Sequence, residues 1–243
     1  MLKFKLLNIS VCNNYCTVVN ILERNLFFSN PVFGECYRQM IKCCDDAHTQ
    51  WPNYCSGFKR IVNTKDVLLS VPVKVVLESS IYDPFGHDLP FWVEVNEEEK
   101  GRIMLVSQDP LRRLSCPGYI TFSSPFGIHS LDYRGNRLTT QIVEVIIKKG
   151  YSVYLTDIYK LYAMRRGVKV SFMPKLFYDI LSAEIDFFKP TSIIGFGKIP
   201  QNALKGIYPS KGVPHPNARL DKAFLRMKGY ARKVDYLVDE ITK

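Results

Sequence analysis

Beyond residue 100, short apolar runs alternate with segments of helical periodicity, and this alternation is the feature that most constrains the fold. Each apolar run is rich in Ile, Val, Leu or Phe and ends at a turn signal, which is typical of a buried strand. The segments between them repeat apolar side chains at intervals of three and four residues, which predicts helices. The predicted strands are 102–107, 152–156, 191–196 and the short extended piece 212–215, and the predicted helices are 136–149, 174–188, 200–205 and 220–241.

This order of elements predicts an α/β fold, a three-layer α/β/α sandwich with a central four-stranded parallel sheet. Residues 1–100 have no such order, so we expect an irregular N-terminal α+β extension (1–100) packed on a core domain (101–243). In parallel sheets, functional groups lie in loops at the carboxyl ends of the strands. Here those loops carry Gln108, Asp109, Asp157, Gly197, Lys198 and His215.

The composition is that of a folded, globular chain. Of the 243 residues, 47% are hydrophobic and 13% are aromatic, and the mean hydropathy is −0.06, which excludes intrinsic disorder. No uncharged apolar stretch approaches the length of about 18 residues that a membrane span needs, so we expect no membrane partner. The first residues lack the apolar run and cleavage site of a secretion signal, so we expect an intracellular protein.

Positive charge is concentrated in the C-terminal part of the chain. The formal net charge is +10, yet residues 1–100 hold 10 Lys and Arg against 12 Asp and Glu. Residues 101–243 hold 23 Lys and Arg against 11 Asp and Glu, so this part carries the whole excess. Such a field attracts a polyanion such as nucleic acid, and a solvated basic surface without a partner is the alternative.

The seven cysteines are expected to be reduced thiols, because their number is odd and no export signal precedes them. Four of them form a local cluster around His48, but no two of these four are separated by the two to four residues that are usual in at least one cysteine pair of a zinc module. This favours buried free thiols. A metal site is the alternative, and its ligands would be Cys36, Cys43, Cys44 and Cys55.

Five short motifs in the C-terminal part occur in the order of one known family. They are Val106-Ser-Gln-Asp-Pro-Leu111, Gly118-Tyr-Ile-Thr-Phe-Ser123, Tyr154-Leu-Thr-Asp-Ile-Tyr-Lys160, Ile194-Gly-Phe-Gly-Lys198 and Val213-Pro-His-Pro-Asn217. Together they resemble the uracil-DNA glycosylase superfamily, whose first motif is Gly-Gln-Asp-Pro-Tyr-His and whose closing motif is His-Pro-Ser. The resemblance covers about residues 102–232, and it implies the same three-layer sandwich.

The resemblance also implies a role for each matched residue. Asp109 would orient or deprotonate the water that attacks C1′ of a flipped nucleotide, and His215 would donate a hydrogen bond to O2 of the leaving base. Taken alone, each residue is better explained by an ordinary turn, core or loop role, and it is their combination that favours the site. The base would be bound by Gln108, Leu111, Phe122 and Asp157, DNA would be bound by Ser123, Lys198, Asn217 and Arg219, and Arg112, Arg113 and Lys222 would lie near the mouth of the site.

Two positions depart from the family pattern. Leu111 stands where the best-known branch has a Tyr that blocks the 5-methyl group of thymine, so the exclusion of thymine is open. Asp157 stands where the family has a base-reading Asn, and an ionised carboxylate would accept from N3–H of uracil but repel O4. A protonated Asp157 would instead complement cytosine, and burial favours that state. A shifted register, with Thr156 or Lys160 at the base, is the alternative.

The sequence therefore predicts a hydrolase that cleaves the N-glycosidic bond of uracil or another deaminated or damaged base in DNA, as in base excision repair. A catalytically inactive DNA-binding or protein-interaction member of the same fold is one alternative, and another α/β nucleotide or nucleoside enzyme is a second. We expect DNA as the partner, a monomer, and no cofactor for the chemistry. Some branches of the family carry a four-cysteine iron–sulfur cluster, which keeps such a site open at the cysteines named above.

Overall fold

A computed structural model describes the chain at residues 60–63, 85–88, 90–93, 95, 98–108, 119–123, 137–160, 162–163, 174–205 and 207–243.

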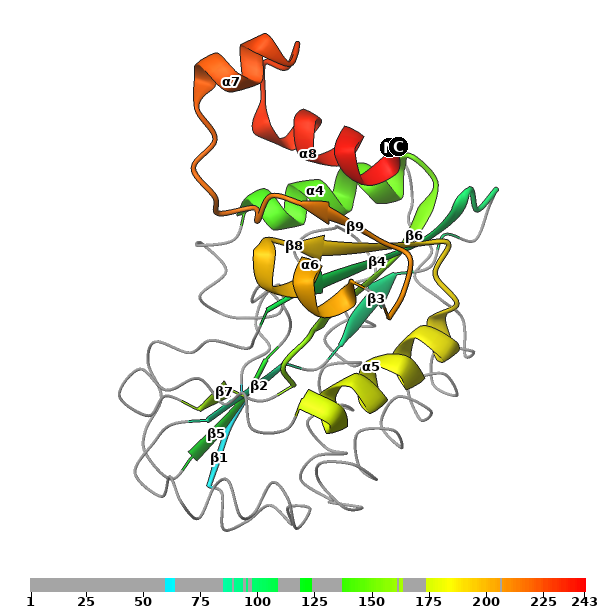
Figure 1. The fold of residues 1–243 in the computed structure, drawn as a ribbon, viewed down its shortest axis with the longest axis vertical. Coiled ribbons are helices and arrows are strands. Elements are labelled where there is room, and N and C mark those ends of the chain that lie inside the picture. Colours follow the sequence, from blue (N-terminus) through cyan, green and yellow to red (C-terminus); the bar gives the residue numbers. More distant parts are fainter. Residues whose placement is uncertain are drawn as a thin grey trace.

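The centre of the molecule is a five-stranded sheet, here called the main sheet (Figure 1). It consists of β3 (Phe91–Val93), β4 (Gly101–Ser107), β6 (Tyr151–Asp157), β8 (Ser192–Phe196) and β9 (Ser210–Val213). The strand order is β3-β6-β4-β8-β9. The last four of these strands are parallel, and β3 pairs with β6 in the antiparallel direction. The predicted four-stranded parallel sheet is confirmed, and it has one antiparallel strand at its edge.

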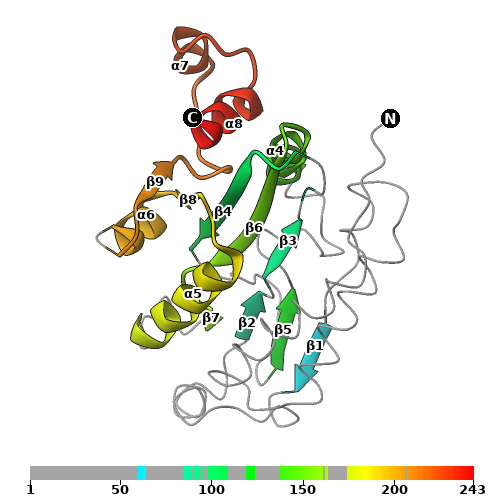
Figure 2. The same cartoon turned by 90° about the vertical axis from the view of Figure 1, so that its right-hand side faces the viewer.

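Helices cover both faces of the main sheet (Figure 2). On one face lie α4 (Arg137–Lys148) and α8 (Lys233–Thr242), which contact each other as well as the sheet. On the other face lie α5 (Pro174–Phe188) and α6 (Lys198–Leu204). The predicted three-layer α/β/α sandwich is therefore confirmed.

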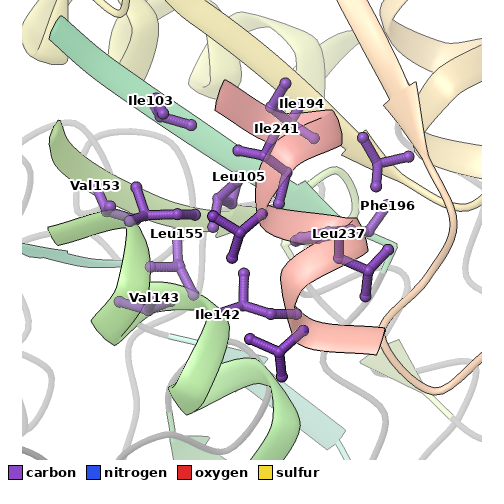
Figure 3. Close-up of a cluster of buried hydrophobic side chains, with 14 of the residues drawn as sticks. Ile103, Leu105, Ile142, Val143, Val153, Leu155, Ile194, Phe196, Leu237 and Ile241 are labelled. Atoms are coloured by element: carbon purple, nitrogen blue, oxygen red, sulfur yellow. The ribbon is translucent and has the colours of Figure 1, made fainter. Parts of the chain in front are cut away.

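Alternate side chains of each parallel strand supply a separate core to each helix layer. Leu105 belongs to one buried cluster with Ile142 of α4 and Leu237 of α8 (Figure 3). Tyr154, in the next strand of the sheet, faces the opposite layer, where its ring centroid lies 5.2 Å from that of Phe188 on α5. Because both faces are buried, these strands are nearly continuous apolar runs, and this is why they stand out in the sequence.

A second, smaller sheet, here called the small sheet, has the strand order β1-β5-β2-β7. Its members are β1 (Arg60–Asn63), β2 (Phe85–Asp88), β5 (Tyr119–Ser123) and β7 (Tyr162–Ala163). Strands from before and after residue 100 pair within it, and β3 likewise pairs with β6 of the main sheet. Hydrogen-bonded ladders therefore cross the predicted boundary between residues 1–100 and 101–243.

The prediction of one terminal helix over 220–241 is wrong. The structure has a short helix α7 (Lys222–Met227) and then α8, separated by Gly229. Gly229 has φ +81°, its N–H bonds to the carbonyl of Arg226, and the N–H of Tyr230 bonds to the carbonyl of Leu225. This is the Schellman ending of a helix, and glycine adopts the required left-handed conformation without strain.

Two smaller differences concern element ends at the candidate site. Helix α6 begins at Lys198 rather than at residue 200, and β9 ends at Val213 rather than at residue 215. Pro200 is tolerated within the first turn of α6 because its missing N–H has no partner inside the helix there. His215 consequently lies in the loop after β9 rather than in the strand.

Candidate active site at the carboxyl end of the main sheet

The four parallel strands end side by side, and these ends carry most of the predicted site residues. The ladder between β4 and β6 pairs Ser107 with Asp157 and is continued by a bond from the N–H of Tyr159 to the carbonyl of Gln108. The ladder between β8 and β9 pairs Phe196 with Val213. The residues that follow these strands therefore meet at one end of the sheet, as parallel pairing requires.

The direction in which successive strands are added to the sheet reverses between β4 and β8. After β4 the chain contributes β5 to the small sheet and returns through α4 to β6 on one side of β4, and the later strands β8 and β9 lie on the other side. Helix α6 follows β8 directly, and in parallel sheets ligands bind at the carboxyl ends of the strands beside such a topological switch point. Among the described residues, Gln108 follows β4 and the turn at Gly197 follows β8, so these two residues lie at the strand ends on either side of this point.

Two glycines allow α6 to start close to the end of β8. A Cβ atom on Gly195 would stand 2.9 Å from the backbone nitrogen of Gln201, so any side chain would push α6 away. Gly197 has φ +82°, and its N–H donates to the carbonyl of Val213 at the end of β9. A Cβ atom at Gly197 would lie 3.6 Å from Cβ of His215, so this turn and the His215 loop are neighbours.

Asp157 is the last residue of β6, and only 3% of its surface is exposed. The hydroxyl of Ser107, its partner in the β4–β6 register, donates a hydrogen bond to its Oδ1. The N–H of Ile158 then donates to the carbonyl of Ser107 over 2.9 Å. The side chain that the sequence predicts to contact the base is thus held by the neighbouring strand through Oδ1.

His215 is half-buried in the loop that follows β9. Its Nδ1 accepts a hydrogen bond of 3.0 Å from the N–H of Asn217. The pKa of His215 is lowered by burial of the imidazole and by the positive charge of Lys233. The neutral form is therefore favoured, and because Nδ1 is an acceptor, the proton of that form resides on Nε2. A neutral imidazole with an Nε2 proton can donate a hydrogen bond to a developing negative charge.

A buried polar cluster supports the end of β6 from the α5 side. Lys160 is 1% exposed and Glu184 of α5 is 0% exposed, and their Nζ and Oε2 atoms are 2.5 Å apart. Lys160 also donates to Thr156 over 2.6 Å, and Thr156 in turn donates to Glu184. The backbone carbonyl of Lys160 accepts from Nδ1 of buried His87 in β2, which joins the small sheet to this loop. The cluster holds residues 156–160 in place.

This cluster includes Thr156 and Lys160, the two residues that the sequence offers as alternatives to Asp157 for contacting the base. Both Thr156 and Lys160 are almost fully buried, and both are engaged with Glu184 beneath the sheet. Asp157, between them, pairs with Ser107 of the neighbouring strand instead. Of these three residues, Asp157 is the one whose side chain is held at the strand end rather than by α5.

Several predicted residues lie on the surface of the same region. Lys198 is exposed at the first turn of α6, and Asn217, Arg219 and Lys222 are exposed in and after the His215 loop. Ala218 donates its N–H to the carbonyl of His215 over 2.8 Å, so the loop is a tight turn. The side chains predicted to contact DNA therefore border the carboxyl end of the main sheet.

Other predicted residues lie outside the described residues. These are Asp109, Leu111, Arg112, Arg113, Cys36, Cys43, Cys44, Cys55 and His48. Phe122 and Ser123 are described only through their backbone, as the last two residues of β5. In the register of the small sheet Phe122 is the partner of His87, which contacts the loop after β6.

Sequence reasoning missed the residues that support the site, namely Ser107, His87, Glu184 and Lys233. Glu184 has a detectable signal, because it occupies the buried stripe of α5 between Phe177, Leu181 and Phe188. A carboxylate in such a stripe needs a buried partner. The other three have no local signal, because their partners come from distant segments of the chain.

Within the part of the chain that the structure describes, no helix is long and apolar enough to cross a membrane, and no three His, Cys, Asp or Glu side chains gather as a metal site would require. No protein-family model and no curated protein matches this chain.

Proposed function

We propose that this protein is a DNA glycosylase that hydrolyses the N-glycosidic bond of a flipped-out uracil or another deaminated or damaged base. The observation that supports the proposal is that Gln108, Asp157 and His215 all lie at the carboxyl ends of strands of one parallel sheet, beside its switch point. In the motif order these residues match the polar groups that a glycosylase needs around the base. Asp109, the residue proposed to act on the attacking water, directly follows Gln108.

The proposed chemistry divides between the sugar and the base. Cleavage passes through an oxocarbenium-like state, which the carboxylate of Asp109 would stabilise while it orients the water. The base leaves with negative charge on O2, and Nε2–H of neutral His215 is suited to donate to it. Loss of one such donor typically costs about 10²–10³ in rate.

The preferred base depends on Asp157. Its Oδ1 accepts from Ser107, so a proton on this carboxyl group would reside on Oδ2. The protonated form has one donor and one acceptor, which suits N3 and the amino group of cytosine. The ionised form has acceptors alone, which suits N3–H of uracil but not its O4. An amide at this position would accept from Ser107 and donate to O4, so Asp157→Asn is expected to raise activity on uracil relative to cytosine.

The basic surface beside the site would hold the DNA backbone. Lys198 at the start of α6 and Arg219 and Lys222 after the His215 loop are exposed, and these cationic side chains would bind phosphates of the DNA that flank an extruded nucleotide. Extrusion costs roughly a few kcal/mol, and contacts to the flipped base and its flanking phosphates offset it.

The test is a strand-cleavage assay after alkali treatment. Labelled single- and double-stranded oligonucleotides would carry uracil, hypoxanthine, thymine opposite guanine, or cytosine. Asp109→Asn is the test variant, and Asp186→Asn, an exposed carboxylate on α5, is the matched control. We expect an abasic product from one base that is lost in Asp109→Asn and kept in Asp186→Asn. Binding of DNA without product from any base would favour the catalytically inactive alternative.

A further inference from the structure

We propose that Lys233 is the positioning residue for His215, because its ammonium group ties together the two carbonyls that flank Asn217 and so holds the turn that carries the imidazole. The consequence for catalysis rests on the function proposed above, whereas the effect on His215 itself does not.

The hydrogen bonds of Lys233 join the His215 loop to helix α8. Lys233 is the first residue of α8, and its Nζ donates to the carbonyls of Pro216 and Ala218. Helix α8 is anchored directly after it, because Val234 and Leu237 are buried in the main core. An ammonium group has three donors on a flexible stem, so one lysine can satisfy two carbonyls that no strand or helix pairs.

The same turn is closed by two bonds that involve His215. Its carbonyl accepts from the N–H of Ala218 over 2.8 Å, and its Nδ1 accepts from the N–H of Asn217 over 3.0 Å. These bonds determine the ring orientation only while the backbone of 215–218 keeps its shape. Lys233 binds that backbone at two points, so its removal releases the turn and with it the imidazole.

Lys233 also acts on His215 through its charge. It lowers the pKa of His215 together with burial, and burial lowers the pKa of Lys233 itself. The β8–α6 turn, on the other side of His215, presents uncharged Gly197 and then exposed Lys198. Lys233 is thus a cationic group that acts on the imidazole through its charge as well as through the turn that it binds.

The experiment combines a titration of His215 by NMR with a pH–rate profile. The chain has four histidines, so His215→Gln identifies the signal. Lys233→Met removes charge and donors, Lys233→Gln keeps an amide donor without charge, and Lys233→Arg keeps both. Lys205→Met removes an exposed positive charge from the end of α6 and is the matched control.

We expect Lys233→Met to raise the pKa of His215 and to move the acid limb of kcat to higher pH. A misplaced imidazole should also lower kcat by about 10- to 100-fold with little change in KM. Lys233→Arg should restore most of both properties, Lys233→Gln should restore part of kcat but not the pKa, and Lys205→Met should change neither.

An unchanged titration of His215 in Lys233→Met and Lys233→Gln overturns the proposal, and so does an equal change in Lys205→Met. If the wild-type protein releases no base, the proposed function fails, and the NMR titration still decides the role of Lys233. If Lys233→Met does not fold, Lys233→Gln and Lys233→Arg supply the comparison.

Discussion

The buried pair of Lys160 and Glu184 allows a quantitative prediction. Removal of Lys160 in the variant Lys160→Met leaves the carboxylate of Glu184, 0% exposed, with hydrogen bonds from Thr156 and Tyr154 but without a countercharge. Breaking a buried pair in this way costs about 3–5 kcal/mol.

Removal of both charges should be far less harmful than removal of one. In the double variant Lys160→Met/Glu184→Leu, no buried charge remains, and the main loss is the hydrogen bonding of Thr156, which costs about 1 kcal/mol. The double variant should therefore be about 2–4 kcal/mol more stable than Lys160→Met. The two substitutions are strongly non-additive because each residue is the other's partner.

Urea unfolding followed by far-ultraviolet circular dichroism measures these differences. Thermal unfolding gives a second measure. At roughly 2–4 °C per kcal/mol for a chain of this size, Lys160→Met should lower the midpoint temperature Tm by about 6–20 °C. The matched control is Lys175→Met, which breaks an exposed pair with Asp179 at 2.7 Å and should change stability by no more than about 0.5 kcal/mol. Additive losses in the double variant, or a loss in Lys160→Met no larger than in the control, would refute the reasoning.

Three further predictions follow from single features. Gly195→Ala puts a Cβ atom 2.9 Å from a backbone nitrogen of α6 and should cost about 1–3 kcal/mol in urea unfolding, and an unchanged midpoint would contradict the close approach of α6. The pKa of His215 in the folded chain lies below its ordinary value of 6.5, so between these two values the unfolded chain binds more protons than the folded chain. The free energy of unfolding should therefore fall as the pH drops through this window. His215→Gln should remove this component when the free energy of unfolding is measured against pH. If Lys198 and Arg219 each contact a phosphate of duplex DNA, Lys198→Gln and Arg219→Gln should each reduce the slope of log affinity against log salt by about 0.9, and unchanged slopes would exclude those contacts.

Most of the fold could be predicted because the parallel strands are buried on both faces. The predicted helix 174–188 matches α5 in both bounds, and the strands at 102–107, 152–156 and 191–196 differ from β4, β6 and β8 by at most one residue at either end. The prediction of a single terminal helix over 220–241 was wrong because apolar periodicity continues on both sides of Gly229. The sequence does not show whether a glycine will adopt positive φ and end a helix. The antiparallel partner β3 carries no local signal of its pairing with β6.

The site could be predicted only as far as it depends on the ends of strands. Gln108 and Asp157 directly follow predicted strands and His215 ends the predicted extended piece 212–215, so parallel pairing places all three at one edge of the sheet. The groups that support them come from other layers of the molecule. Lys233 reaches the His215 loop from α8, and Glu184 reaches Lys160 from α5 across 24 residues of sequence. Such contacts arise from packing: helical periodicity places Glu184 in the buried stripe of α5, but no motif of the sequence identifies the partner of Glu184 or of Lys233.

The chemistry that Asp157 can offer also depends on a contact that the sequence does not contain, the hydrogen bond from Ser107 of the neighbouring strand. The motif alone shows an acid where the uracil-DNA glycosylase motif that it resembles has an amide, and it leaves the protonation and orientation of that acid undefined. The β4–β6 register pairs it with Ser107, whose hydroxyl donates to Oδ1 and so requires that oxygen to be an acceptor. An amide in this place would meet the same requirement with its carbonyl oxygen and would turn its NH₂ group toward the position of Oδ2. Asp157→Asn therefore changes the chemistry of one atom while it keeps the bond to Ser107, so a change in base preference would report on that atom rather than on the fold.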